Sequence, residues 1–99
     1  MADTPWMGTQ GLQQVREGSA VDAVTRSKRR IADVEPEIHA WVTMSDDAEN
    51  RAARVDAGSD DGLPLSGVPV GVKDIIDVAG MPTRCGSSIT SPDPVAESA

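Results

Sequence analysis

The segment from Gly67 to Gly80, GVPVGVKDIIDVAG, is the most apolar stretch of the chain and restricts its possible folds most strongly. Its Val and Ile side chains recur closely enough to line both faces of a strand, which is the pattern of a strand covered on both sides. The stretch also contains Lys73, and a charged amine is costly to bury. This lysine must therefore reach water, find a partner, or be held in a perturbed state.

The size and composition of the chain argue against a self-sufficient core around this segment. The chain has 99 residues, enough for one small domain, and only 38% of them are hydrophobic. Only Trp6 and Trp41 are aromatic, so a core of Val, Ala and Ile would be marginally stable. We expect the chain to be part of a larger domain, and the Val/Ile faces of residues 68–78 to lie open without it.

Charge and cysteine content limit the classes of function. The formal net charge is −7, whereas nucleic-acid-binding surfaces are normally basic, so no direct nucleic-acid partner is expected. No apolar run is long enough for a membrane span, and the start of the chain lacks signal-peptide features. Cys85 has no second cysteine to pair with. These features predict a cytoplasmic protein without a membrane partner.

Helical periodicity predicts helices over residues 9–16, 19–35 and 45–57. The second should begin at its N-cap Ser19 and end before Pro36. Ser45 should cap the third, and Gly58 should follow its last turn. Strands are predicted over residues 38–44, 68–74 and 76–79.

The expected fold class is α/β within a single incomplete domain, residues 1–99. Its helical part covers about residues 9–62, and a segment with the lysine-bearing strand and loops covers about residues 63–99. Other motifs lack the partners that their chemistry requires. Asp74 stands where a phosphate-binding loop needs Ser or Thr, Cys85 is expected to be a small buried side chain, and His39 has no second ligand at metal spacing.

Lys73 itself allows two interpretations. An amine is a general base only when neutral, and burial among apolar side chains favours the neutral form. A lysine so placed can accept a proton from a serine hydroxyl. Asp74 need not interfere, because successive side chains of a strand point to opposite faces. The alternative is a lysine whose head simply reaches water.

A wider pattern around Lys73 resembles the lysine segment of the amidase signature family, roughly L-x-G-x-P-x-x-V-K-D-x-x-x-x-x-G-x-x-T-x-x-G-S. The stretch LSGVPVGVKDIIDVAGMPTRCGSS matches it at Leu65, Gly67, Pro69, Val72, Lys73, Asp74, Gly80, Thr83, Gly86 and Ser87. Upstream, RIADVEPEIHAWVTM is similar to the first helix and following strand of that family. The resemblance extends over about residues 9–99.

The resemblance implies an amidase that hydrolyses a carboxamide C–N bond with a Ser–cis-Ser–Lys triad and no metal or organic cofactor. By position, the general base is Lys73. The two serines belong to a Gly/Ser-rich stretch that does not occur before Ala99, and Ser87 and Ser88 only fill the end of the lysine motif. The chain then corresponds to the N-terminal piece of the amidase signature fold, with helices packed on a mixed sheet, and should be inactive alone.

Two other functions remain open from the sequence. The A subunit of a glutamyl/aspartyl-tRNA amidotransferase shares the lysine motif and, as the family implies, delivers ammonia from glutamine to a partner subunit. A non-catalytic standalone module would use Lys73 structurally. The expected partners are a small-molecule amide substrate and the missing C-terminal remainder of the domain, together with a second copy of the chain or other amidotransferase subunits.

Overall fold

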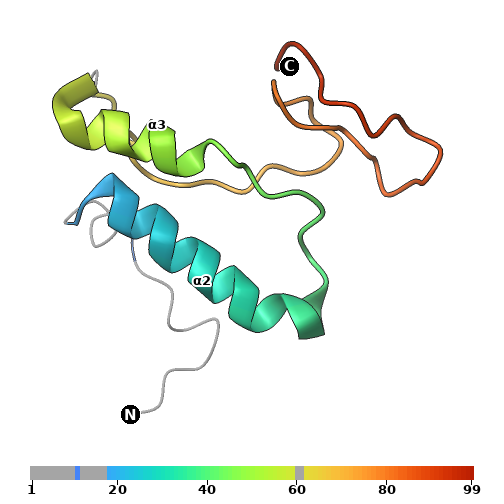
Figure 1. Ribbon diagram of the computed structural model, residues 1–99, viewed down its shortest axis with the longest axis horizontal. Coiled ribbons are helices and arrows are strands. Elements are labelled where there is room, and N and C mark those ends of the chain that lie inside the picture. Colours follow the sequence, from blue (N-terminus) through green and yellow to red (C-terminus); the bar gives the residue numbers. More distant parts are fainter. Residues whose placement is uncertain (1–10, 12–17, 60–61) are drawn as a thin grey trace. The chain divides into compact units, whose positions relative to one another are not determined.

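The computed structural model describes Gly11, residues 18–59 and residues 62–99. In these ranges the α-helices are α2 (Ala20–Ile38) and α3 (Ala48–Arg54), and a π-helical turn, η1 (Val55–Ser59), follows α3 (Figure 1). The helix predicted over residues 9–16 lies outside the described residues except for Gly11.

The chain divides into two compact units. The first, here called the helical unit, consists of the residues up to Asp33 together with Asp47–Pro69. The second, here called the loop unit, consists of Val34–Asp46 and Val70–Ala99. The helical unit contains α3, η1, most of α2 and the start of the lysine motif up to Pro69, whereas the loop unit contains the end of α2 and the lysine motif from Val70 onward.

The N-terminus of α2 lies where the sequence predicts it because its first backbone N–H groups find acceptors. The Ser19 Oγ accepts a hydrogen bond from the Asp22 N–H at 2.9 Å, which confirms Ser19 as the N-cap. The Asp56 carboxylate, from η1, accepts the N–H groups of Ala20 at 2.7 Å and Val21 at 3.0 Å. This carboxylate also lies at the positive end of the helix dipole.

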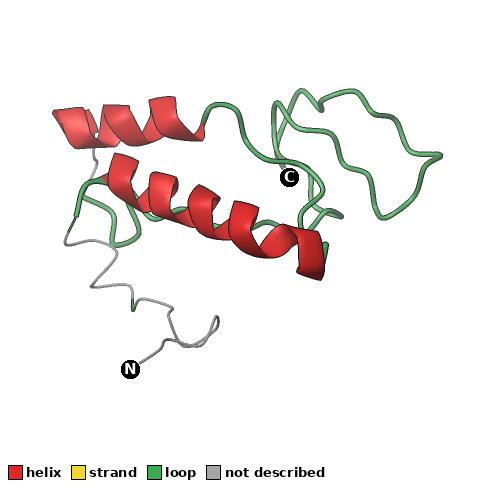
Figure 2. Cartoon of the chain, turned by 60° about the horizontal axis from the view of Figure 1, so that its bottom comes forward, coloured by secondary structure: helices red, strands yellow, loops and turns green. Residues whose placement is uncertain are grey.

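Helices α2 and α3 lie side by side in the helical unit (Figure 2), and a small apolar cluster joins them. Its buried members are Ala20, Val24 and Ala52, with Val21, Ala48 and Val55 packed against them. Outside this cluster, α2 and α3 are also joined by an ion pair, in which the Lys28 Nζ lies 2.7 Å from a Glu49 carboxylate oxygen. In the described part of the chain, no helix is both long and apolar enough to cross a membrane.

The predicted end of α2 before Pro36 is wrong, since the helix contains Pro36 and continues to Ile38. Proline removes only its own N–H group, and this close to the end the following turn still forms, with the His39 N–H donating to the Glu35 carbonyl at 2.9 Å. His39 then takes a left-handed conformation, with φ 53°. The Glu35 carboxylate accepts the next two backbone N–H groups and holds the chain as it leaves the helix.

The predicted start of the third helix at Ser45 is also wrong. The N-cap is Asp47, and its side chain makes no capping hydrogen bond. It lies instead 3.9 Å from the guanidinium of Arg54. At the other end the C-cap of α3 is Val55, and Gly58, inside η1, has a non-helical φ of 96°, which confirms that this glycine interrupts the helical backbone.

The predicted strands over residues 38–44, 68–74 and 76–79 are not formed, and the described ranges contain no β-strand. A strand requires a neighbour with which to exchange hydrogen bonds. Here the backbone of the lysine motif bonds locally instead, from the Ile76 N–H to the Lys73 carbonyl at 3.0 Å. The helical part of the predicted α/β fold is therefore confirmed, and residues 18–59 and 62–99 do not show the sheet.

Candidate functional site

Lys73 lies on irregular backbone in the loop unit, and its side chain is exposed. The apolar residues around it are exposed as well, with relative exposures of 73% for Val70, 47% for Val72, 60% for Ile75 and 47% for Ile76. These four side chains are therefore not covered by the described residues. The expectation that its Val/Ile faces lie open without further protein is confirmed at these positions.

The backbone just before Lys73 is covered by an aromatic ring. A Cβ atom on Gly71 would lie 2.9 Å from Cη2 of Trp41, closer than a real Cβ contact allows. Only a glycine lets the ring approach the backbone this closely. Sequence reasoning missed this contact because Gly71 falls at a position that the family pattern leaves free.

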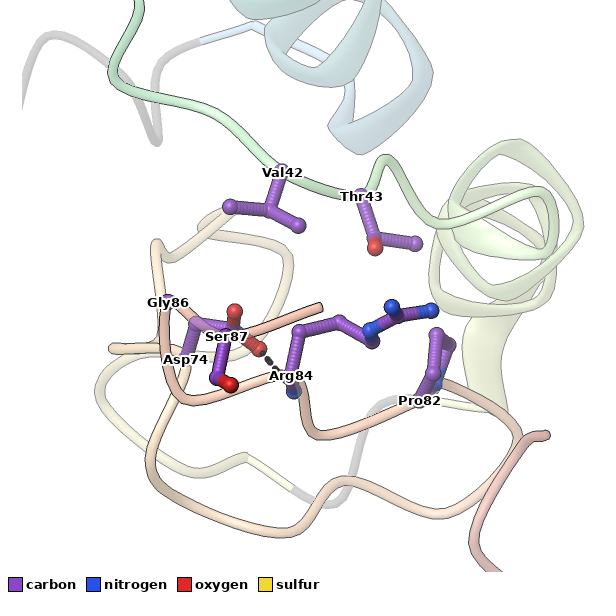
Figure 3. Close-up of a pocket in the computed structure, with 7 residues that line it drawn as sticks. All are labelled: Val42, Thr43, Asp74, Pro82, Arg84, Gly86 and Ser87. Atoms are coloured by element: carbon purple, nitrogen blue, oxygen red, sulfur yellow. Dashed lines mark hydrogen bonds between the residues drawn. The ribbon is translucent and has the colours of Figure 1, made fainter. Parts of the chain in front are cut away.

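The residue just after Lys73 is bound to a second segment of the loop unit. Asp74 Oδ1 accepts the Arg84 N–H at 2.9 Å, and the Asp74 carbonyl accepts the Cys85 N–H at 2.9 Å. Asp74 Oδ2 is buried and has no hydrogen-bond donor among the described residues. Figure 3 shows the Asp74 carboxylate against the turn that contains Gly86 and Ser87.

That turn matches the G-S end of the lysine motif. The Ser87 N–H donates to the Arg84 carbonyl at 3.0 Å, and the Thr90 hydroxyl contacts the carbonyls of Arg84 at 2.8 Å and Ser87 at 2.9 Å. Cys85 and Gly86 both have left-handed backbone, with φ 54° and 69°. Cys85 is exposed, so the expectation of a buried side chain is wrong, because this turn directs it outward.

Asp74 and the turn line one side of a pocket of about 320 Å³ within the loop unit (Figure 3). Its lining residues are Val42, Thr43, Asp74, Pro82, Arg84, Gly86 and Ser87. Lys73 does not line it, so the pocket belongs to the Asp74 side of the motif. The Ser87 Oγ accepts the Ile89 N–H at 3.3 Å, which fits a turn residue rather than a nucleophile. Among the described residues, no group of His, Cys, Asp or Glu side chains is arranged to hold a metal ion.

Comparison with known proteins shows a match to one protein family. The model of the family described as Amidase matches residues 22–99, which include the whole lysine motif. Several glutamyl-tRNA(Gln) amidotransferase A subunits are similar in sequence. That of Methanosarcina mazei is 36% identical over 85 residues, covering 85% of this chain and 17% of the relative.

Two bacterial relatives with the same name are closer in identity over a shorter stretch. The protein of Acidothermus cellulolyticus is 44% identical over 78 residues, covering 75% of this chain and 15% of the relative. That of Bacillus thuringiensis is 42% identical over 77 residues, covering 75% of this chain and 16% of the relative. The chain thus spans about one sixth of the length of such relatives. No solved structure matches the chain.

Proposed function

The chain belongs to the amidase family, and we propose that it is the N-terminal part of an enzyme that cleaves a carboxamide C–N bond by serine acyl transfer. The observation that carries the proposal is the family match over residues 22–99, which includes Lys73 and the motif around it. In this proposal Lys73 is the general base. The activity belongs to the complete enzyme, because a base without its nucleophile forms no acyl-enzyme.

The proposed reaction proceeds in two stages. A serine Oγ attacks the amide carbonyl carbon, and its proton passes through the cis serine to the neutral amine of Lys73. The C–N bond then breaks, and the leaving nitrogen takes that proton as it departs as ammonia or an amine. Water attacks the remaining ester in the same way and releases the carboxylic acid. No metal or organic cofactor takes part.

The surroundings of Lys73 support a base once they are covered. Val72, Ile75 and Ile76 are exposed on either side of it. Pairing of this segment into the family's mixed sheet would cover these side chains, remove water from the amine and favour its neutral form. The nearest carboxylate in sequence, Asp74, binds the Arg84 backbone N–H, which fixes it on that side of the motif.

A second candidate function is the A subunit of a tRNA-dependent amidotransferase. The specific observation in its favour is the name of the similar proteins from Methanosarcina mazei, Acidothermus cellulolyticus and Bacillus thuringiensis. In that case the enzyme would release ammonia from glutamine and pass it to other subunits in the cytoplasm. The chemistry at Lys73 would be the same, and only the substrate and the partners would differ.

The first test is the gene sequence after the codon for Ala99. A reading frame that continues into a Gly/Ser-rich stretch with two serines supports the proposal. A stop codon at this point, with no second chain that carries the serines, would leave the lysine without a nucleophile and overturn it.

The second test compares the complete enzyme with three variants. Lys73→Ala should lower the acylation rate about 10²- to 10⁴-fold, and Lys73→Arg should do about the same because a guanidinium stays protonated. Lys28→Ala, which removes a lysine from the helical unit, is the control and should change the rate less than about threefold. Near-normal acylation by Lys73→Arg would show that the lysine is only a fixed positive charge.

The third test separates the two candidate functions. The complete enzyme, carrying an affinity tag, is purified from its own cells and assayed with simple amides and with glutamine. Hydrolysis of simple amides by the complete enzyme without other subunits supports the amidase. Copurification of other amidotransferase subunits, with activity only in their presence and on glutamine, supports the second candidate.

A further inference from the structure

We propose that Asp74 positions Lys73. It does this by binding the turn at residues 84–87 and a hydrogen-bond donor beyond the described residues. The inference rests on the proposed function, because it assigns to Asp74 a role in placing the proposed base. It goes beyond that function in giving a physical task to the residue that follows the lysine.

Asp74 is attached to the turn at residues 84–87 by two hydrogen bonds. Its side chain binds the Arg84 N–H and its carbonyl binds the Cys85 N–H, each at 2.9 Å. Two hydrogen bonds from one residue to adjacent N–H groups fix both the position and the direction of the backbone. Since Lys73 is the preceding residue, its Cα is held by the same attachment.

The other carboxylate oxygen of Asp74 has no such partner among the described residues. Asp74 Oδ2 is buried, and no donor within residues 18–59 or 62–99 reaches it. A buried carboxylate oxygen without a hydrogen bond costs free energy, more than a neutral group does. We infer that an N–H or O–H group of the rest of the enzyme binds Oδ2.

These two contacts make an amide a poor substitute for the carboxylate. In Asp74→Asn, one orientation of the amide sets its NH₂ against the Arg84 N–H, and the other sets it against the donor at Oδ2. In either orientation, two hydrogen-bond donors face each other and one hydrogen bond is lost. If Oδ2 faced only water, the amide oxygen would stay on Arg84 and the substitution would be mild.

The matched control is Asp77→Asn, the same change in the same segment. The Asp77 carboxylate accepts the Thr83 hydroxyl at 2.7 Å in an exposed position, so an amide can replace it. In the complete enzyme, Asp74→Asn should lower the acylation rate about 10- to 100-fold, mainly in kcat, as expected when a reacting group is misplaced. Asp77→Asn should change it less than about threefold.

The decisive measurement is a double-mutant cycle with Lys73→Ala. If Asp74 acts through the lysine, Asp74→Asn causes no further loss once Lys73 is alanine. Equal losses in both backgrounds, or a loss no greater than that of Asp77→Asn, would overturn the inference. Should Asp74→Asn fail to fold, Asp74→Glu takes its place in the cycle, because it keeps the charge and displaces the acceptors. If Lys73→Ala by itself had no effect, the proposed function would fail instead, so the two failures are distinguishable.

Discussion

One valine side chain is buried in the helical unit, whereas another is exposed in the loop unit. Val24, on α2, is 6% exposed in the small cluster with Ala20 and Ala52, whereas Val70, close to Lys73, is 73% exposed. In the helical unit, apolar side chains pack against one another, and residues of the same unit accept hydrogen bonds from the first N–H groups of α2. The loop unit binds its own turns together but leaves its most apolar segment open. The contrast shows that these helices are completed by residues of their own unit, while a strand segment depends on a pairing partner that the loop unit does not supply.

The largest expected effect on stability is that of Val24→Ala in the helical unit, which is compared with Val70→Ala in the loop unit. Val24→Ala should lower the free energy of unfolding by about 1–3 kcal/mol, because it removes buried methyl groups. Val70→Ala should change it by less than about 0.5 kcal/mol, because Val70 already faces water. Urea unfolding of the 99-residue chain, followed by far-ultraviolet circular dichroism, measures both. Equal losses would break the contrast between the units, and a loss for Val70→Ala only in the complete enzyme would sharpen it.

The next effect concerns the N-terminus of α2. Asp56→Ala removes the carboxylate that accepts two N–H groups there, and should cost about 1–2 kcal/mol of unfolding free energy. Asp93→Ala, an exposed acid in the loop unit, is the control and should be close to neutral. The same urea titration applies, and a helical signal insensitive to Asp56→Ala would show that α2 does not depend on this contact.

A smaller effect is expected at the close contact between Gly71 and Trp41. Gly71→Ala forces the indole ring to move, at a cost of about 1 kcal/mol or less since the ring is partly exposed. The fluorescence of Trp41, measured in a Trp6→Phe background, should shift. Gly18→Ala serves as the control, because a Cβ there meets no atom closer than 3.9 Å. Unchanged emission in Gly71→Ala would rule out the contact.

The smallest effect on stability is expected from the loss of the ion pair between Lys28 and Glu49. The hydrogen bond from Lys28 lowers the pKa of Glu49 from its ordinary value of 4.5. Because the folded-state pKa is the lower one, the pair stabilises the fold above pH 4.5, and this contribution disappears as the pH falls through the lowered pKa. Lys28→Met should return the pKa of Glu49 toward 4.5, as measured by NMR titration. An unaltered titration would mean that the pair does not form in solution.

Sequence patterns predicted those features that depend on neighbours in the chain. Ser19 and Gly58 were identified at the ends of helical segments because capping is a local property. The extent of α2 beyond Pro36 was not, since the Glu35 carboxylate and the left-handed His39 complete that end of the helix. Asp56 was missed because its contact with Ala20 spans 36 positions, and no local pattern reports it.

For the candidate site, the motif located Lys73 and its open apolar neighbours, but it did not describe their geometry. The three strands were predicted from residue type and from the alternation of apolar positions, whereas a strand exists only with a pairing partner. The attachment of Asp74 to the backbone at Arg84 and Cys85 also lies beyond sequence reasoning, since it involves backbone groups rather than a recognisable pair of side chains.

The contact between Asp56 and the start of α2 has a consequence for the order of events during synthesis. Ser19 and the turns of α2 emerge from the ribosome before Asp56 does, and until Asp56 emerges two N–H groups at the helix start lack their acceptor. A single helix of this length is marginal in water, so α2 should remain frayed in the nascent chain. Its N-terminus becomes fixed only when η1 has emerged, which makes the two helices one cooperative step in the growth of the polypeptide.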